Sequence, residues 1–468
     1  YDVEAPSNTS SNQLNIGNLI FGTGVDGTGT TLSSGNIGIG TTTPSAKLTV
    51  AGDINISDVS TGYKIGGDVV LYSSSTLLST LVGSGAGAQL TNGSIGATVL
   101  GYGALSLATS SSQFNTAIGY QALASSTIAD QNTAVGYNSL ALTTTGGLNT
   151  AVGRSSMYNN TTGVNNVAVG RVSLFSNTSG FYNIALGEGA LYSNTTGGNN
   201  VAIGRNALDA STSTGRMVAI GTSALTNNTS GDENVAIGYQ SMFENTDGYW
   251  NAGLGTFALF SNTTGYTNTA MGYAAMYYNE TGYDNVAIGS YALLDAVDAS
   301  NRVAIGDGAI ANQITGNGLI GIGDQTLSFS TSSAENTAIG DLAMQYTTSG
   351  SSNTVIGYRA LRQLTIGDDN TALGTRTLGN ATVGSGNTAI GQQSMAEMIG
   401  GSLNTALGFR SLYRATSSTA LTAVGYLALE ENTTGTENTA VGHESLQETT
   451  SGFSNTALGY LSLTSNIT

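Results

Sequence analysis

Few side chains in this sequence could carry out catalysis. His443 is the only histidine and there is no cysteine, so one copy of the chain cannot assemble a histidine-based triad or a thiolate and imidazole metal site. The best candidate metal ligands are three aspartates spaced 17 residues apart, Asp307, Asp324 and Asp341. Carboxylates stacked about 5 Å apart repel one another, so a Ca²⁺ ion could lie between them, although a solvated acidic edge explains the same spacing. We predict a protein that is not an enzyme and needs no cofactor, with Ca²⁺ as the one ion its side chains suggest.

Aromatic residues recur at the same spacing and suggest a binding surface. They form two columns, one next to the only tryptophan, and the residues are Phe243, Phe260 and Tyr277, then Tyr249, Tyr266 and Tyr283 beside Trp250. Stacked rings next to polar turns could bind the faces of sugars or a partner protein. The same rings could instead cover the edge of the core or fill contacts between subunits.

These positions follow from an internal repeat of 17 residues. A glycine preceded by an aliphatic residue or Met recurs at this spacing from Gly119 to Gly459 without insertion, and two degenerate coils precede it at Gly83 and Gly101. Short apolar runs separated by Gly and Asn at fixed offsets indicate strands and turns, with no helical periodicity. We predict an all-β fold, a β-solenoid of 17-residue coils over residues 80–468 that is regular from about residue 115.

The N-terminal segment lacks this repeat. Residues 1–79 are rich in Gly and contain both prolines, with strand-like stretches at 47–50 and 53–56. This composition predicts an extended connector or stalk with short strands.

Three columns of the repeat predict which residues lie in the core and which lie at a subunit interface. Positions are numbered from the recurrent Gly, which is position 0. Position −1 is always aliphatic or Met and position +4 always Leu, Met or Ile, so we predict that these two columns form the core. Position −2 is Ala in all but three coils, and strand alternation places it on the opposite face. A face of small residues suggests close approach by another surface, which we predict to be other copies around a three-fold axis. The predicted subunit-interface residues are Ala117, Ala134, Ala202, Ala236, Ala304, Ala389 and Ala440.

Two turn positions are replaced together in some coils. Where the usual Gly at position +10 is lost, the Asn three residues later is often lost as well, as in Thr214 with Met217 and Ala299 with Arg302. This pairing predicts one turn device, in which Gly supplies a positive φ and the Asn amide hydrogen-bonds the bend or a ladder of neighbours.

Composition excludes several classes of partner. The formal net charge is −17 and the basic residues are two lysines and ten scattered arginines, whereas nucleic-acid binding needs clustered cations. No apolar run approaches the roughly 18 residues that a membrane span needs. The absence of cysteine fits an exported protein. We therefore expect neither a nucleic-acid partner nor a membrane span.

Two stretches resemble known families. The coil from Asn132 to Leu140 resembles the repeats in the left-handed β-roll heads of trimeric autotransporter adhesins. Residues 35–50 resemble a segment of phage tail fibres and bacterial surface fibres that end in an intramolecular chaperone of the endosialidase type. The first resemblance implies a left-handed parallel β-roll. Both resemblances imply a homotrimeric extracellular fibre, on a cell or virion surface, that attaches to a host or environmental receptor or glycan.

The leading functional hypothesis is a rigid homotrimeric shaft of an adhesive fibre. A phage tail fibre for receptor binding is an alternative. An ice- or glycan-binding solenoid is another, suggested by threonines at position −3 in eight consecutive coils, from Thr337 to Thr456. Alternation with the aliphatic residues at position −1 predicts that these threonines face the core, which argues against ice binding. Because Thr468 falls within a turn, we also expect a longer native product or an end covered by another copy, as in an end-to-end filament.

Overall fold

A computed structural model describes residues 13–16, 20–23, 35–52, 63–65, 68–74, 78–90, 94–109, 111–312 and 315–466. The chain divides into two units, residues 1–75 and 76–468. In the described ranges there are strands, turns and bends but no helix, which confirms the predicted all-β class. The predicted strand at 53–56 and the terminal Thr468 lie outside these ranges.

The first unit contains a four-stranded sheet within the segment predicted as a connector. Its strands pair in chain order, antiparallel between the first three and parallel between the last two, and they are β1 (Gln13–Ile16), β2 (Ile20–Thr23), β3 (Asn36–Ile39) and β4 (Leu48–Val50). The backbone N–H of Ile37 donates to the Lys47 carbonyl at 2.8 Å. Residues 35–50 therefore form a strand, a loop and a second strand that pairs in parallel with the first. Two further strands, β5 (Tyr63–Ile65) and β6 (Asp68–Ser74), pair antiparallel.

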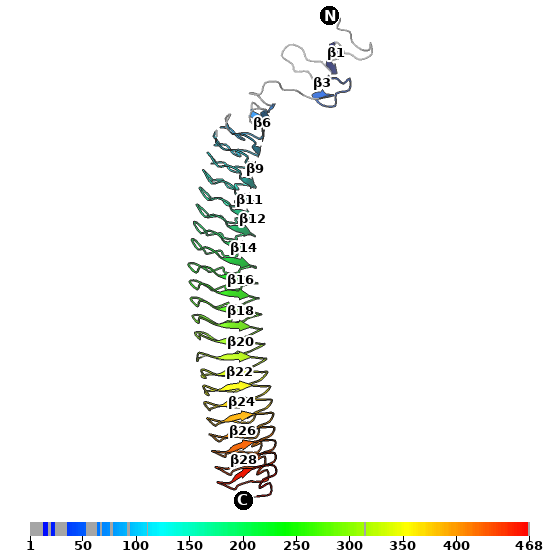
Figure 1. Ribbon diagram of the computed structural model, residues 1–468. Helices are drawn as coiled ribbons and strands as arrows, with labels where there is room; N and C mark the ends of the chain where they lie inside the picture. Colours follow the sequence, from blue (N-terminus) through cyan, green and yellow to red (C-terminus); the bar gives the residue numbers. More distant parts are fainter. Residues whose placement is uncertain are drawn as a thin grey trace. The chain divides into compact units, whose positions relative to one another are not determined.

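The second unit is a β-solenoid that adds one short strand per coil. Figure 1 shows these strands stacked in a single column along the unit. They are β7 (Ser79–Val82), β8 (Thr98–Leu100), β9 (Thr116–Ile118), β10 (Thr133–Val135), β11 (Thr150–Val152), β12 (Val167–Val169), β13 (Ile184–Leu186), β14 (Val201–Ile203), β15 (Val218–Ile220), β16 (Val235–Ile237), β17 (Ala252–Leu254), β18 (Thr269–Met271), β19 (Val286–Ile288), β20 (Val303–Ile305), β21 (Ile320–Ile322), β22 (Thr337–Ile339), β23 (Thr354–Ile356), β24 (Thr371–Leu373), β25 (Thr388–Ile390), β26 (Thr405–Leu407), β27 (Thr422–Val424), β28 (Thr439–Val441) and β29 (Thr456–Leu458).

Adjacent strands pair in parallel with equivalent repeat positions opposite each other. For example, Thr133, Ala134 and Val135 of β10 face Thr150, Ala151 and Val152 of β11. The same register continues to the pairing of β28 with β29. The predicted β-solenoid of 17-residue coils is therefore confirmed.

The strands turn their alanines inward, contrary to the prediction. The position −2 residues named as a subunit interface have no exposed surface in the single chain, and these are Ala117, Ala134, Ala202, Ala236, Ala304, Ala389 and Ala440. Residues with no exposed surface cannot contact another copy, so that prediction is wrong. The position +4 column is buried as predicted, with Leu208 and Met242 among its members, but the aliphatic residues at position −1 are half-buried or exposed.

The inward alanines are small because the opposite wall of the same coil lies close to them. Ser139 and Ser156, both at position +3, donate hydrogen bonds of 2.9 and 3.0 Å to the carbonyls of Ala151 and Ala168 in the next coil's strand. At Gly253, which takes the alanine's place, a Cβ would lie 3.1 Å from Met242 Cγ. The reason proposed for the small residues, a close approach by another surface, was correct. That surface belongs to the same chain.

Sharp bends let 17 residues close around this narrow core. The reference glycines have φ near the value of Gly306, +137°, in a region that side-chain-bearing residues rarely adopt. Non-glycine residues at positions +2, +4 and +12 also have positive φ, as at Asn138, Leu140 and Asn165. Inter-coil hydrogen bonds hold these bends, since the N–H of Asn138 donates to the Tyr120 carbonyl at 2.9 Å and that of Leu140 to the Ser156 carbonyl at 3.0 Å.

Buried asparagines at position −4 form the predicted ladder. The Asn166 amide donates to Asn149 Oδ1 at 3.1 Å and to the Gly180 carbonyl at 2.8 Å, and Asn166 Oδ1 accepts from the backbone and side chain of Asn183. Arg302 replaces this Asn in one coil, and its Nε donates to the Gly316 carbonyl at 2.8 Å. Burial lowers the pKa of Arg302 to about 10.

At position +10 a positive φ, as predicted, occurs at Gly316, Gly384 and Gly401, but in other coils the glycine is needed for space instead. Gly146, Gly163 and Gly180 are not among the residues with positive φ. A Cβ on Gly163 would lie 2.6 Å from both Asn177 Nδ2 and the Gly180 carbonyl. Asn177 belongs to a second buried ladder, at position +7, in which its amide donates to Asn160 Oδ1 at 2.8 Å. The Gly thus fits between two asparagine ladders, and the predicted role of positive φ is wrong for these coils.

Candidate functional site

The outward face of the stacked strands runs along the solenoid from coil to coil. It consists of the position −3 column, Thr or an aliphatic residue in nearly every coil, and the aliphatic position −1 column. Val169, Met271 and Leu407 are 39%, 43% and 45% exposed. Exposed apolar patches of this kind are typical of surfaces that meet a partner.

The eight consecutive threonines lie on this outward face. Thr337, Thr354 and Thr371 pair in register on adjacent strands, and the alignment continues to Thr456. All eight are half-buried or exposed, and none of their hydroxyls hydrogen-bonds to the described part of the chain. The expectation that they face the core is therefore wrong, and the objection to ice binding that rested on it no longer holds.

The three aspartates occupy one exposed column directly after the reference glycines. The backbone N–H of Asp324 donates to Asp341 Oδ1 at 3.1 Å, and Asp307, Asp324 and Asp341 are all exposed. Across the described ranges no three His, Cys, Asp or Glu side chains come together in a way that could hold a metal ion. The structure therefore does not support the predicted Ca²⁺ site, and the column is an acidic edge.

Both predicted aromatic columns stack as regular ladders. The ring centroids of Phe243, Phe260 and Tyr277 are 5.4 and 4.9 Å apart, and those of Tyr249, Tyr266 and Tyr283 are 5.1 and 4.8 Å apart, in each case in chain order. Trp250 packs edge-on against Tyr249 at 5.0 Å and donates from Nε1 to Glu233 at 3.0 Å. Desolvation and the neighbouring Tyr283 and Tyr249 raise the pKa of Tyr266. The stacking is thus established, and its use as a binding surface remains a prediction.

Position +1 holds a further ladder of exposed rings and charges. Tyr102, Tyr120 and Tyr137 stack at 5.4 and 5.2 Å, and near the other end His443 stacks on Tyr426 at 4.9 Å. In the same column Arg171 Nε donates to Glu188 at 3.0 Å. That hydrogen bond and the charge of Arg171 hold the pKa of the Glu188 carboxyl below its ordinary value. Such exposed pairs stabilise a fold only weakly.

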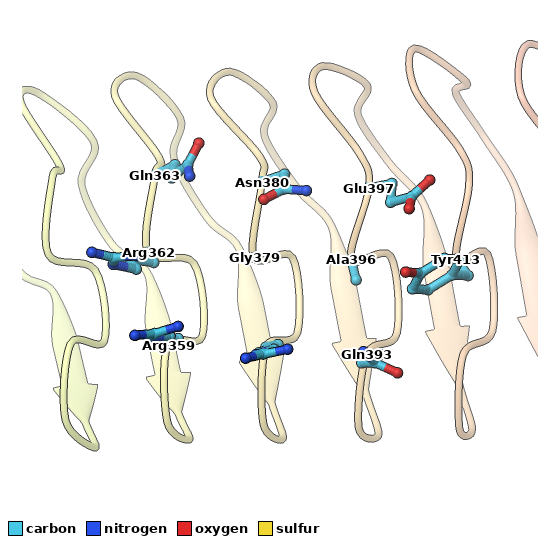
Figure 2. A pocket seen from close by; sticks show the side chains of 10 residues that line it. Arg359, Arg362, Gln363, Gly379, Asn380, Gln393, Ala396, Glu397 and Tyr413 are labelled. Atoms are coloured by element: carbon cyan, nitrogen blue, oxygen red, sulfur yellow. The ribbon is translucent and has the colours of Figure 1, made fainter.

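Sequence reasoning missed a groove between positions +2, +5 and +6 of the coils from Gly357 to Gly408. It has a volume of about 250 Å³, and its lining residues are Arg359, Arg362, Gln363, Arg376, Gly379, Asn380, Gln393, Ala396, Glu397 and Tyr413. Figure 2 shows Gln363, Asn380 and Glu397 in one row and Arg362, Gly379, Ala396 and Tyr413 in the next. The small residues at position +5, where other coils carry stacked rings, are the sequence signal that could have revealed it. We call this site the basic groove.

Two findings concern the chain as a whole. Among the described residues there is no helix of the length and apolarity needed to cross a bilayer. The resemblances to adhesin heads and tail fibres rest on the sequence stretches that carry them. No family model, no curated protein and no solved structure matches the chain.

Proposed function

We propose that the protein is the rigid shaft of an extracellular attachment fibre, in which three copies pack together through their outward strand faces. The observation that carries this proposal is the unbroken inter-coil pairing from β7 to β29. Buried asparagine ladders run beside the strands. At about 4.8 Å per coil, the coils from Gly119 to Gly459 make a rod of roughly 100 Å. A rod with hydrogen bonds across every coil boundary resists bending, as a spacer between a surface and its receptor must.

The size of the outward strand face supports association of copies. A three-residue strand is about 10 Å long and each coil adds about 4.8 Å of rod. The face from Gly119 to Gly459 therefore offers about 1,000 Å² per copy, more than the roughly 800 Å² that each partner buries in a typical stable complex. Three such faces of equal width can close around a three-fold axis, which leaves no strand face exposed.

Charges on the outward face are expected to separate the copies. Ile203→Lys, Ile237→Lys and Met271→Lys together place three cations on the apolar stripe, because all three side chains point outward. Sedimentation equilibrium is expected to show a trimer for the native chain and a monomer for the triple variant, with an unchanged circular dichroism spectrum. The control is Ala202→Leu, which changes the inside of the single chain and leaves its outward face as it is. Overpacking should lower the stability of that chain by about 1–3 kcal/mol, but the chain should still sediment as a trimer. A native chain that sediments as a monomer would contradict the assembly.

Ice binding is a second candidate function because of the outward threonine array. The eight in-register hydroxyls on adjacent strands form a regular outward array and make no hydrogen bond to the described part of the chain. If the face binds ice, the native chain should be monomeric and show thermal hysteresis, and Thr388→Lys should abolish that hysteresis. If copies cover the face, no hysteresis is expected. A strand face that is covered by other copies cannot also bind ice, so the thermal-hysteresis assay separates the two functions.

A further inference from the structure

The basic groove concentrates positive charge in a chain that is strongly acidic overall. The formal net charge is −17 and only 12 residues are Lys or Arg, yet Arg359, Arg362 and Arg376 line one groove with a single carboxylate, that of Glu397. Arg359 and Arg376 occupy the same repeat position in adjacent coils, so their backbones are about 5 Å apart. Like charges at that spacing repel, and an anion bound between them would relieve the repulsion.

Several arginines elsewhere in the solenoid form ion pairs with glutamates, whereas the three groove arginines do not. Arg171 pairs with Glu188 in the next coil, and Arg216 and Arg414 pair with the glutamates 17 residues after them. The residue 17 positions after Arg359 is Arg376, and the residue 17 positions after Arg376 is Gln393. Within the described residues none of the three groove arginines forms an ion pair. The groove therefore lacks the internal charge compensation found in those coils.

The hydrogen-bonding groups of the groove are largely uncommitted. Arg362 Nε donates to Gln345 at 2.9 Å, while Arg359 lies over the Tyr358 ring at 5.0 Å and its buried Nε has no hydrogen-bond partner. The side chain of Arg376 makes no hydrogen bond or ion pair to the described part of the chain, and neither do the amides of Gln363 and Asn380. Arg359 Nε is a buried donor without a partner, which is costly until a ligand accepts from it. Arg376, Gln363 and Asn380 are exposed, so their donors and acceptors are accessible to a ligand.

The remaining walls indicate what kind of anion fits. Tyr413 closes one side with its ring, over which Arg410 lies at 4.1 Å. Side-chain amides suit sugar hydroxyls, an aromatic ring suits the apolar face of a sugar, and a guanidinium suits a carboxylate through paired N–H donors. A volume of about 250 Å³ is just below the range for small-molecule sites, about 300–1,000 Å³, so the groove has room for about one sugar ring and a longer saccharide would extend beyond it.

We propose that the basic groove binds a carboxylated saccharide, with Arg359 and Arg376 holding the carboxylate and with Gln363, Asn380 and Gln393 contacting the hydroxyls. Sugar rings would follow the groove along the rod axis beside Tyr413, over the small residues Gly379 and Ala396 (Figure 2). The proposal rests on the proposed attachment function and deepens it by naming the class of receptor. The groove lies on the turns, at positions +2, +5 and +6, so the proposed strand-face assembly leaves it open.

Isothermal titration of the full chain with hyaluronan tetrasaccharide tests the proposal. The neutral probe is the same tetrasaccharide with its carboxyl groups reduced, and inorganic phosphate tests for unspecific anion binding. We expect binding of the acidic probe, at least tenfold weaker binding in Arg376→Gln, and at least a hundredfold loss in Arg359→Gln with Arg376→Gln, because each charge-assisted hydrogen bond contributes about tenfold or more. Arg414→Gln, which removes a charge outside the groove, is expected to bind as the native chain does.

Several results would overturn the groove assignment. These are no binding of the acidic tetrasaccharide, equal binding of the reduced one, equal competition by phosphate, or unchanged affinity in the double arginine variant with an unaltered circular dichroism spectrum. Binding only to an acidic protein would also overturn it in favour of a protein partner. Sedimentation of the same samples keeps the two proposals apart: a monomer that binds the saccharide supports the groove and contradicts the trimer, and a trimer that does not bind does the reverse.

Discussion

Gly306→Ala is expected to destabilise the solenoid by about 3 kcal/mol or more. Gly306 has φ +137°, and a Cβ there would lie 2.6 Å from the carbonyl carbon of Gly323 and 3.1 Å from the N–H nitrogen of Asp324. Neither backbone strain nor this clash can relax, because the next coil is held by its own parallel strand pairing. Strain in such a region and overpacking each cost about 1–3 kcal/mol.

The same coil offers a matched control two residues later. Gly308 has φ +59°, and the nearest atom to its Cβ would be Gln325 Cγ at 3.7 Å. Asn occupies this repeat position with a similar φ at Asn138 and Asn206, so Gly308→Asn should change the free energy of unfolding by no more than about 0.5 kcal/mol. Urea denaturation followed by circular dichroism compares the two. Equal losses at Gly306 and Gly308 would show that the reference glycine is not required by its conformation.

Asn166→Ala is expected to lower the stability of the solenoid by about 3 kcal/mol or more, although the residue has no exposed surface. The change removes two donated hydrogen bonds, to Asn149 Oδ1 and the Gly180 carbonyl, and two accepted from Asn183, all of them buried. The backbone N–H of Asn183 would be left without its acceptor inside the core. Each intramolecular hydrogen bond contributes about 1 kcal/mol and an unpaired buried donor costs about 1–3 kcal/mol.

The loss of stability caused by Asn166→Ala should be confined to the coils next to the substitution. Amide hydrogen exchange is expected to speed up in the coils that contain Asn149, Asn166 and Asn183 and to remain slow several coils away, because each coil contacts its neighbours only. Asn159→Ala is the control, since this half-buried side chain makes no hydrogen bond to the described residues and its loss should change stability by about 0.5 kcal/mol or less. A uniform rise in exchange along the whole rod would contradict the ladder as a local device.

Repetition made much of the fold predictable. A period that never varies from Gly119 to Gly459 allows only stacking in which equal positions meet, so the parallel register, the ring ladders through Phe260 and Tyr266, and the asparagine ladder could all be inferred. The prediction was wrong about which face of the strands is buried. Alternation separates Ala202 from Ile203 into opposite faces but does not say which face is inside, and the usual preference for burying the larger side chain points the wrong way here.

Some of the candidate sites could be predicted from the repeat alone, and the basic groove could not. The columns of Asp324 and Tyr266 were predictable because their members share one repeat position, and a column needs only the period. The basic groove draws Arg376 from position +2, Gly379 from +5 and Asn380 from +6, and how these columns face one another depends on the bends. Those bends use positive φ at residues such as Arg376 and Leu378, which no glycine marks.

By itself, the sequence determined the all-β class, the 17-residue coil and the order in which equivalent residues stack, because a strict period leaves one way to pair strands. Only the tertiary structure decided which strand face is buried, and the reason is the width of the coil. With 17 residues per turn the opposite wall lies so close, as the hydrogen bond of 2.9 Å from Ser139 to the Ala151 carbonyl shows, that only Ala, Gly or an occasional Val fits inside the strand. The aliphatic residues at position −1 are thereby turned outward, where they form the surface on which the proposed assembly depends.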